Sequence, residues 1–286
     1  MSDKSTPFIS IYIPTKNRFT LLQRAVQSCL AQSYQSFEII VVDDGSAPEV
    51  QLQLQQFAQQ TPKMKLLCNA VSVGAGAARN QAIAIAKGEF ITGLDDDDEF
   101  TAERLQEFVQ NWTDADSFLS TGYQFYTGPG QMLRSARKAM TITADDLLMV
   151  NLVGNQVFTK TRYLRDIGGF DPQLVACQDY DVWIRLTQSF GAGRRLANFS
   201  YIVHQEHELE RISNPERRLT GHQQLIDKHR LLWTASQLRS QQFYRQLQSG
   251  QPLSFALVPL ALWRNLKVLL KVALVQWYQK KRFFSR

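Results

Sequence analysis

Strand-like and helix-like segments alternate between residues 8 and 110, and this alternation limits the fold more than any other feature of the chain. The segments expected as strands are short apolar runs at 8–13, 37–42, 65–68 and 90–92. The segments expected as helices have apolar side chains at helical spacing and lie at 21–31, 52–60 and 75–86. Strands and helices in this order predict an α/β fold with a parallel sheet covered by helices.

Polar side chains follow three of these strands at the point where each strand ends. They are PTKNR at 14–18, DDGS at 43–46 and DDDD at 95–98. In an open α/β sheet, ligands bind beyond the carboxyl ends of the strands. We therefore expect these three segments to lie close together and to form a binding site.

Five consecutive acids, Asp95 to Glu99, follow the strand expected at 90–92. Neighbouring ionised carboxylates raise each other's proton affinity unless a cation neutralises them. In an extended chain, Asp95 and Asp97 would face one side, and Asp96 and Asp98 the other. Oxygen ligands of this kind favour Mg²⁺ or Mn²⁺, which complete their shells with water and substrate phosphates. The alternative is a solvated acidic loop or the first turn of the following helix.

Length, composition and cysteine content point to a globular protein. With 286 residues, of which 44% are hydrophobic and 20% charged, the chain can bury one large core or two smaller ones. Its N-terminal segment lacks the apolar run of a signal peptide. Cys29, Cys68 and Cys177 are too few and too scattered for a disulfide framework or a zinc site. A reducing cytoplasm is the compartment that these features favour.

The net charge of +6 comes from the end of the chain. Residues 252–286 contain seven basic residues and no acid, so the remainder has a net charge of −1. This distribution argues against a nucleic-acid partner, because such proteins have basic residues across the binding face of the fold. Apolar side chains in this segment, including Trp263 and Trp277, share one helical face and the basic ones another, which predicts a helix at an anionic membrane surface. A helix packed on its own domain or on a partner chain is the alternative.

Six segments in a fixed order resemble family 2 glycosyltransferases of the GT-A fold. They are IPTKNR at 13–18, IVVDDGS at 40–46, GAARN at 76–80, LDDDD at 94–98, GGFD at 168–171 and QDYDVWIR at 178–185. The resemblance covers about 200 residues. It implies a GT-A fold, with a Rossmann-like nucleotide-sugar-binding sheet and flanking helices. It also implies a nucleotide-sugar donor, usually a UDP-sugar, a divalent metal bound through an Asp-x-Asp motif, and inversion at the anomeric carbon.

The resemblance also implies roles for particular residues. The nucleotide-sugar would be bound by Pro14, Thr15, Asn17, Arg18, Asp44, Arg79, Asp95 and Asp96. Of these, Thr15 and Asp44 would hold the uridine, and Arg79 would lie near the phosphates. Without the resemblance, Asp44 could equally belong to a turn or a helix cap, and Arg79 could be a surface residue of its helix.

The metal, Mn²⁺ or Mg²⁺, would be bound by Asp97 and His207, with Asp95 either near the ribose or reaching the ion through water. His204 is the alternative histidine, and either histidine could instead be an ordinary hydrogen-bonded residue. The metal would neutralise the charge that grows on the diphosphate as the glycosidic bond breaks.

The catalytic base implied by the resemblance is Asp179, which would take a proton from the acceptor hydroxyl. The family usually has Glu-Asp at this place, whereas this chain has Gln178 and Asp179. Asp181 is the competing carboxylate, and both acids would also suit the first turn of a helix. Residues 154–156 and Trp183 could face the acceptor, although Trp183 fits a buried position equally well.

The expected organisation is a glycosyltransferase domain at 1–215, a helical extension at 216–251 and a basic, amphipathic membrane-associating tail at 252–286. The expected activity is metal-dependent, inverting hexosyl transfer from a nucleotide-sugar to a saccharide hydroxyl. A cytoplasmic enzyme at the membrane surface would suit a polyprenyl-diphosphate-linked acceptor of surface polysaccharide or O-antigen biosynthesis. The alternatives are a metal-dependent nucleotidyltransferase and a catalytically silent membrane adaptor.

Overall fold

The computed structural model describes residues 6–129, 131–135, 138–154, 156–205 and 215–249. The expected metal ligand His207 and the tail at 252–286 lie outside these residues. The chain divides into two compact units. The first contains residues 1–144, 153–173 and 178–209, and the second contains 145–152, 174–177 and 210–286.

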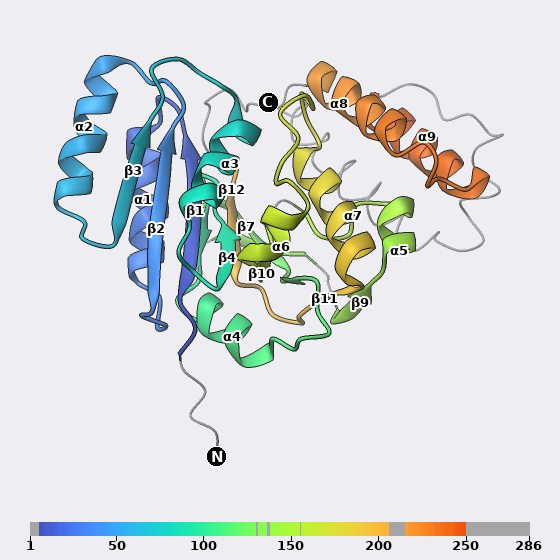
Figure 1. Ribbon diagram of the computed structural model, residues 1–286, viewed down its shortest axis with the longest axis horizontal. Coiled ribbons are helices and arrows are strands. Elements are labelled where there is room, and N and C mark those ends of the chain that lie inside the picture. Colours follow the sequence, from blue (N-terminus) through green and yellow to red (C-terminus); the bar gives the residue numbers. More distant parts are fainter. Residues whose placement is uncertain (1–5, 130, 136–137, 155, 206–214, 250–286) are drawn as a thin grey trace. The chain divides into compact units, whose positions relative to one another are not determined.

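An eight-stranded sheet forms the centre of the first unit (Figure 1). Its strands are β1 (Ile9–Thr15), β2 (Phe37–Asp43), β3 (Met64–Cys68), β4 (Phe90–Gly93), β6 (Leu119–Ser120), β9 (Met140–Ile142), β10 (Phe158–Lys160) and β11 (Gly193–Arg195). Their order is β3-β2-β1-β4-β10-β6-β11-β9. The first four are parallel, as the sequence predicts, whereas β10 runs antiparallel to both of its neighbours. The carboxyl ends of β1, β2 and β4 therefore meet at one edge.

Helices cover both faces of this sheet, and the residues of β1 and β2 are almost completely buried. The helices of the first unit are α1 (Phe19–Leu30), α2 (Pro48–Gln59), α3 (Ala75–Ile85), α4 (Arg104–Asn111), α6 (Thr161–Asp166) and α7 (Gln178–Phe190). Helices α1 and α3 lie on opposite faces (Figure 1). The loop between β1 and α1 therefore approaches the edge formed by the carboxyl ends of the strands from one face of the sheet. The side chains of α3 approach the same edge from the opposite face.

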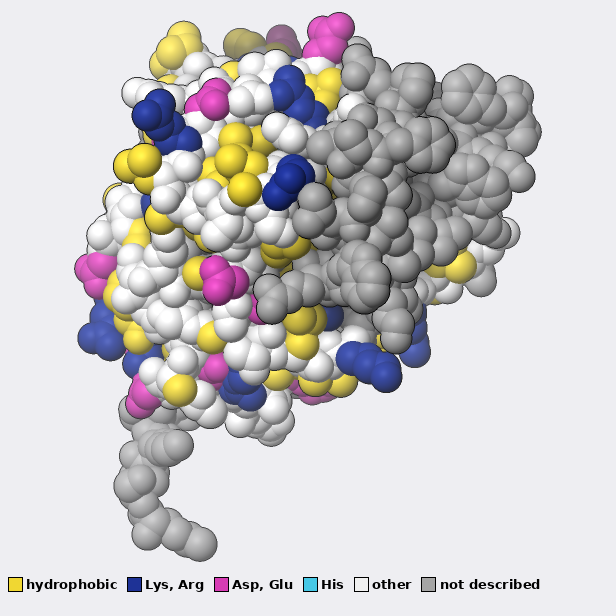
Figure 2. All heavy atoms as spheres, turned by 90° about the vertical axis from the view of Figure 1, so that its right-hand side faces the viewer, with side chains coloured by type: hydrophobic (Ala, Val, Ile, Leu, Met, Phe, Trp, Pro, Cys, Tyr) yellow, Lys and Arg dark blue, Asp and Glu magenta, His cyan; other side chains and the backbone are white. Residues whose placement is uncertain are grey.

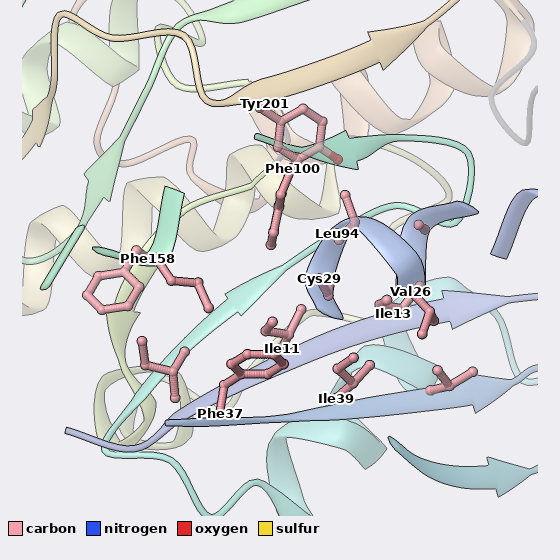
Figure 3. Close-up of a cluster of buried hydrophobic side chains, with 14 of the residues drawn as sticks. Ile11, Ile13, Val26, Cys29, Phe37, Ile39, Leu94, Phe100, Phe158 and Tyr201 are labelled. Carbon is pink, nitrogen blue, oxygen red and sulfur yellow. The ribbon is translucent and has the colours of Figure 1, made fainter. Parts of the chain in front are cut away.

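The main hydrophobic core lies between the sheet and α1 (Figure 3). Ile11 and Ile13 of β1 pack there with Val26 and Cys29 of α1, and all four are fully buried. Burial raises the pKa of the Cys29 thiol, so this cysteine is an inert core residue.

A second, four-stranded sheet begins where the acidic segment at 95–99 ends. It has the order β5-β12-β7-β8, with β5 (Glu99–Phe100), β12 (Tyr201–His204), β7 (Tyr123–Gly128) and β8 (Gln131–Arg134). Strand β5 begins at the last of the five acids and pairs antiparallel with β12, where Tyr201 lies opposite Phe100. The acids therefore connect β4 of the first sheet to β5 of the second.

The described part of the second unit is helical. It contains α5 (Ala144–Met149), α8 (Pro215–Lys228) and α9 (Ala235–Ser249), of which α8 and α9 occupy the range expected as a helical extension. The Gln241 side chain joins them, because it contacts His222 of α8 at 2.7 Å and donates to the Leu148 carbonyl at 2.8 Å. Within the described ranges, no helix has the length and apolar character needed to cross a membrane. The described basic and acidic side chains in Figure 2 are interspersed rather than gathered by sign.

Candidate active site

The four aspartates form a tight turn at the carboxyl end of β4. The Asp98 N–H donates to the Asp95 carbonyl at 3.1 Å, so the segment is not extended as the sequence suggested. The expected alternation nevertheless holds: Asp96 and Asp98 are about 5% exposed, whereas the side chains of Asp95 and Asp97 are 24% and 21% exposed. The two partly exposed carboxylates are the ones expected to meet a metal. We call residues 95–98 the acid turn.

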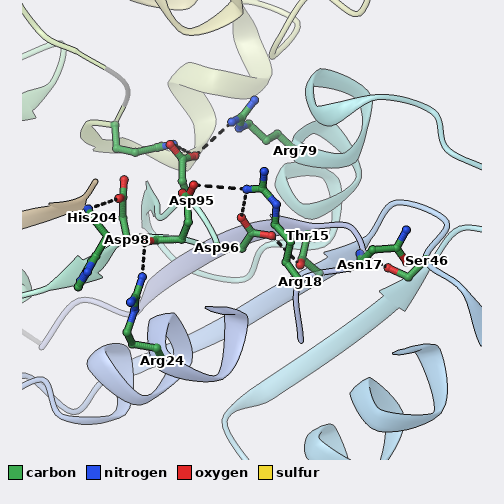
Figure 4. A network of polar contacts seen from close by, with 12 residues as sticks. Thr15, Asn17, Arg18, Arg24, Ser46, Arg79, Asp95, Asp96, Asp98 and His204 are labelled. Atoms are coloured by element: carbon green, nitrogen blue, oxygen red, sulfur yellow. Dashed lines mark hydrogen bonds and ion pairs between the residues drawn. The ribbon is translucent and has the colours of Figure 1, made fainter. Parts of the chain in front are cut away.

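Asp96 links the acid turn to the loop after β1 (Figure 4). Its carboxylate accepts a hydrogen bond from the Thr15 hydroxyl at 2.8 Å and contacts the Arg18 guanidinium at 3.3 Å. Arg18 also contacts Asp97 at 3.3 Å. Burial raises the pKa of Asp96 to about 6, the Asp97 charge adds to this rise, and the Thr15 and Arg18 contacts oppose it. Thr15, Arg18 and Asp96, all expected to bind the nucleotide-sugar, thus lie in one network.

Asp95 is held from the other face of the sheet. Arg79 of α3 contacts its Oδ1 atom at 3.2 Å, and the Gln156 amide donates to the same oxygen at 2.9 Å. Arg79 also lies 5.3 Å from the ring of Phe170. Burial disfavours the Arg79 charge, but Asp95 and other nearby anionic groups outweigh that effect and raise its pKa. Arg79 is therefore a fixed positive charge beside the acid turn, not a free surface arginine.

The remaining side of the acid turn is bound by β12 and α1. The Asp95 N–H donates to the Tyr201 hydroxyl at 3.2 Å, and the His204 N–H donates to the Asp98 carboxylate at 3.1 Å. Arg24 of α1 donates to the Asp97 carbonyl at 2.6 Å. Burial, together with the charges of Asp95 and Asp97, raises the pKa of Asp98 well above its ordinary value. These contacts hold the backbone of the acid turn in place.

The His204 ring contacts Glu99, the acid that follows the acid turn. Its Nε2 atom is 2.6 Å from Glu99, and its ring packs against Tyr126 at 4.9 Å. The structure therefore gives the alternative metal ligand a contact with Glu99.

The two candidate bases occupy different environments at the start of α7. Asp181 is fully buried and forms an ion pair with Arg185 at 2.6 Å. Asp179 retains some exposure, and its carboxyl group lies within the electrostatic reach of Arg79 and Asp95. Burial raises the pKa of Asp179 to about 6, despite opposing contributions from the Tyr180 N–H and Arg79. Asp179 is thus a partly exposed carboxyl group with a raised pKa, whereas Asp181 is held in its ion pair with Arg185.

Gln178 replaces the first acid of the pair usual in the family, and it faces α3. Its amide oxygen is 3.4 Å from Arg79, and a Cβ atom at Gly76 would come within 3.2 Å of its side chain. Because Gln178 is neutral, Asp95 and Asp179 are the carboxyl groups that raise the pKa of Arg79.

Asp44 is bound to the loop that precedes α3. Its two carboxylate oxygens accept hydrogen bonds from the Ser72 hydroxyl, the N–H groups of Val73 and Gly74, and the Asn69 amide. Burial acts to raise the pKa of Asp44, but these four bonds together lower it. Four bonds fill the ordinary capacity of a carboxylate, so Asp44 holds this loop in the structure.

Asn17 joins the loops after β1 and β2. Its N–H donates to the Ser46 hydroxyl at 2.7 Å, and its side-chain oxygen accepts from the Ala47 N–H at 2.8 Å. The backbone φ of Asn17 is +54°, a value that asparagine tolerates better than most residues. Pro14, the last residue of this candidate set, is partly exposed within β1.

Of the residues considered for the acceptor, Trp183 and Gln156 are buried and Gly154 is partly exposed. Trp183 is fully buried and donates to the Gly154 carbonyl at 2.9 Å, which supports the core interpretation. Gln156 is buried beside Asp95. Tyr201 and Arg24 were not predicted as site residues, because their contacts with the acid turn span 106 and 73 residues of sequence.

An open α/β sheet with polar residues at the carboxyl ends of its parallel strands is typical of α/β proteins that bind a ligand at that edge. Residues 10–166 match the model of Glycosyl transferase family 2, and the chain belongs to this family. WcaA of Escherichia coli (strain K12), named as a glycosyl transferase of colanic acid biosynthesis, is 34% identical over 235 residues, 79% of this chain and 83% of WcaA. TuaG of Bacillus subtilis (strain 168), named for teichuronic acid biosynthesis, is 27% identical over 205 residues, 68% of this chain and 80% of TuaG.

The fold is that of a GT-A glycosyltransferase. The crystal structure of S. aureus TarS residues 1–349 in complex with UDP-GlcNAc matches with a TM-score of 0.64 and 18% identity. The match covers 92% of this chain and 78% of the TarS chain. The α/β GT-A architecture expected from the sequence is therefore confirmed.

Proposed function

We propose that the chain transfers a sugar from a UDP-sugar to a hydroxyl group of a saccharide acceptor, with inversion at the anomeric carbon. One observation carries this proposal. Arg79 contacts Asp95 of the acid turn, and the Asp179 carboxyl group, whose pKa is about 6, also raises the pKa of Arg79. The acid turn and Asp179 therefore both interact electrostatically with the same arginine. The TarS complex, which contains UDP-GlcNAc, supports a nucleotide-sugar as the donor.

In this mechanism, Asp179 takes the proton of the acceptor hydroxyl as the hydroxyl oxygen attacks the anomeric carbon. The bond between that carbon and the diphosphate oxygen breaks, and the nucleoside diphosphate leaves with the bonding electrons. A carboxylate with a pKa of about 6 is ionised at pH 7 and is a stronger base than an ordinary aspartate. Arg79 provides fixed positive charge near the departing diphosphate.

The acid turn suits Mn²⁺ or Mg²⁺, because the partly exposed carboxylates of Asp95 and Asp97 supply oxygen ligands. In the described part of the chain, no three His, Cys, Asp or Glu side chains are grouped to hold a metal. We propose that Asp97, Asp95 and His207 bind the ion and that the diphosphate and water complete its shell. When bound, the ion neutralises charge on the leaving group.

Thr15 and Asp44 are the proposed contacts of the uridine. Because Asp44 already accepts four hydrogen bonds, the uracil N–H must replace one of them. The bond from Asn69, at 3.3 Å, is the longest of the four. We propose that the base displaces this amide.

A donor panel tests the activity. Purified protein with Mn²⁺ or Mg²⁺ is mixed with UDP-, GDP- and dTDP-sugars, and both donor binding and nucleotide release are measured. We expect UDP-sugars to bind with metal, and Asp97→Ala to abolish metal-dependent binding and to lower turnover by about three orders of magnitude or more. Full activity of Asp97→Ala, or of the wild type in EDTA, would exclude the metal role. Nucleotide attachment without sugar transfer would indicate a nucleotidyltransferase, and no donor binding would indicate a silent adaptor.

The relatives named for colanic and teichuronic acid biosynthesis support a surface polysaccharide as the product. We propose a lipid-linked saccharide acceptor and peripheral binding of residues 252–286 to anionic membranes. Each basic residue near such a surface contributes about 1 kcal/mol, and salt weakens the attraction. A chain that ends before Pro252 should still bind donor but should not sediment with anionic vesicles at low salt. If the full-length protein ignores anionic vesicles, the membrane assignment is wrong.

A further inference from the structure

The Gln156 side chain connects Asp95 to Tyr12 of the central strand β1. Gln156 does not belong to any of the polar segments that follow β1, β2 and β4. Gln156 precedes β10 and is 2% exposed. Its Nε2 atom donates to Asp95 Oδ1 at 2.9 Å, and its Oε1 atom accepts from the Tyr12 hydroxyl of β1 at 3.0 Å. Tyr12, Gln156 and Asp95 therefore form a short hydrogen-bonded chain.

The direction of this chain follows from its chemistry. The Asp95 oxygen is the acceptor and Gln156 Nε2 the donor, so the amide turns its NH₂ group towards Asp95. The amide oxygen then faces Tyr12, which must donate. Tyr12 is 1% exposed, and burial raises the pKa of its hydroxyl, so the proton needed for this bond stays in place.

The backbone makes room for this chain at one place in β4. A Cβ atom at Gly93 would come within 1.9 Å of Gln156 Oε1 and 2.4 Å of the Tyr12 ring. Any other residue at position 93 would displace one of the two side chains. The absence of a side chain at Gly93 therefore lets the amide pass over β4 to the acid turn.

We propose that Gln156 is a positioning residue, which orients the Asp95 carboxylate for donor binding while Tyr12 fixes the direction of the Gln156 amide. This rests on the proposed function, because it assumes that Asp95 faces the donor. Arg79 contacts the same Asp95 oxygen, and Tyr201 accepts a hydrogen bond from the Asp95 N–H. With Gln156, three side chains therefore fix this residue before a donor arrives, and such preorganisation strengthens binding.

Binding of UDP in the presence of Mn²⁺, measured by calorimetry, tests the proposal. Gln156→Met keeps nearly the same volume and removes the amide, and we expect a loss of UDP affinity of about tenfold to a hundredfold, as for a hydrogen bond to a charged group. Gln156→Glu should weaken binding further, because two carboxylates would then face each other. Tyr12→Phe keeps the ring and should give a smaller loss, so it serves as a second test if a Gln156 variant does not fold.

A double-mutant cycle separates positioning from a general effect on folding. In an Asp95→Ala background, Gln156→Met should cause no further loss of UDP affinity, because the group that it orients is gone. The control is Gln124→Met in β7 of the second sheet. It removes a hydrogen bond of 2.7 Å from the Gln124 side-chain amide to the Phe199 carbonyl and should leave UDP affinity unchanged.

The possible outcomes distinguish this proposal from the proposed function. If the wild type binds UDP with Mn²⁺ and Gln156→Met binds equally well, the positioning role is wrong and the function stands. The same holds if the Gln156→Met loss persists in full in the Asp95→Ala background. If the wild type does not bind UDP with Mn²⁺, both proposals fail together.

Discussion

Asp179→Asn should inactivate the protein and at the same time stabilise it. The carboxyl group lies where the folded protein disfavours its charge, since burial raises its pKa from 3.8 to about 6. The folded state therefore binds the Asp179 proton more tightly than the unfolded state does. Stability linked to this group is highest at low pH, falls as the pH rises from about 4 to about 6, and stays reduced at pH 7.

The size of the effect follows from the shift in pKa. A rise from 3.8 to about 6 corresponds to an upper limit of about 3 kcal/mol at pH 7, which the partial exposure of Asp179 reduces to about 1–3 kcal/mol. At pH 4.5 the upper limit falls to about 1 kcal/mol, because the folded state is then almost fully protonated. The neutral amide of Asn removes the cost of burying a charge. It cannot take the proton of the sugar-acceptor hydroxyl, so the rate of transfer should fall by about a hundredfold or more.

Urea unfolding at pH 7 and pH 4.5 measures the stability, and sugar transfer with saturating donor measures the rate. The matched control is Asp181→Asn, two residues further along α7. Asp181 is fully buried and paired with Arg185 at 2.6 Å, so its replacement should destabilise the protein by about 3–5 kcal/mol. If Asp179→Asn destabilises the protein at pH 7 as much as Asp181→Asn does, then Asp179 is a structural carboxylate and the reasoning fails.

Two further substitutions address the supports of the site. Tyr201→Phe removes the hydroxyl group that accepts a hydrogen bond from the Asp95 N–H and also contacts Asp98. We expect the free energy of unfolding to fall by about 1–3 kcal/mol. An unchanged urea midpoint would contradict this. Asp44→Asn should weaken the hold on residues 72–74, so their amide hydrogens should exchange faster while exchange in the strands is unchanged. Equal protection of the loop in both proteins would show that Asp44 does not hold it.

The parallel half of the sheet could be predicted because its strands are long and its helices are regular. β1 and β2 are seven-residue strands with almost every residue buried, so they appear in the sequence as mainly apolar runs, interrupted by Ser10 and Glu38. The other half contains β6, with two residues, and β10, with three. Strands this short have no periodicity to detect, and long-range pairing alone places them in the sheet.

The candidate site divides in the same way. The acid turn, Arg79 and Asp179 lie in segments whose residue types and order resemble the family, so the sequence alone was enough to propose them as site residues. Gln156 and Tyr12 are ordinary residue types, and their hydrogen bond joins positions 144 residues apart. Only the three-dimensional fold brings such a pair to the acid turn.

The acids that follow β4 look alike in sequence but do different work, and the turn decides which does what. Asp96 points inward to the Thr15 hydroxyl, and Asp98 points inward to the backbone of β12. Both are buried with raised pKa values, so each adds to the cost of folding at neutral pH while fastening the turn to its neighbours. Asp95 and Asp97 keep part of their surface exposed, where a donor or cation can reach them. A run of identical acids therefore provides two partly exposed carboxylates, which we propose as the donor- and metal-binding pair, on a support made of the other two.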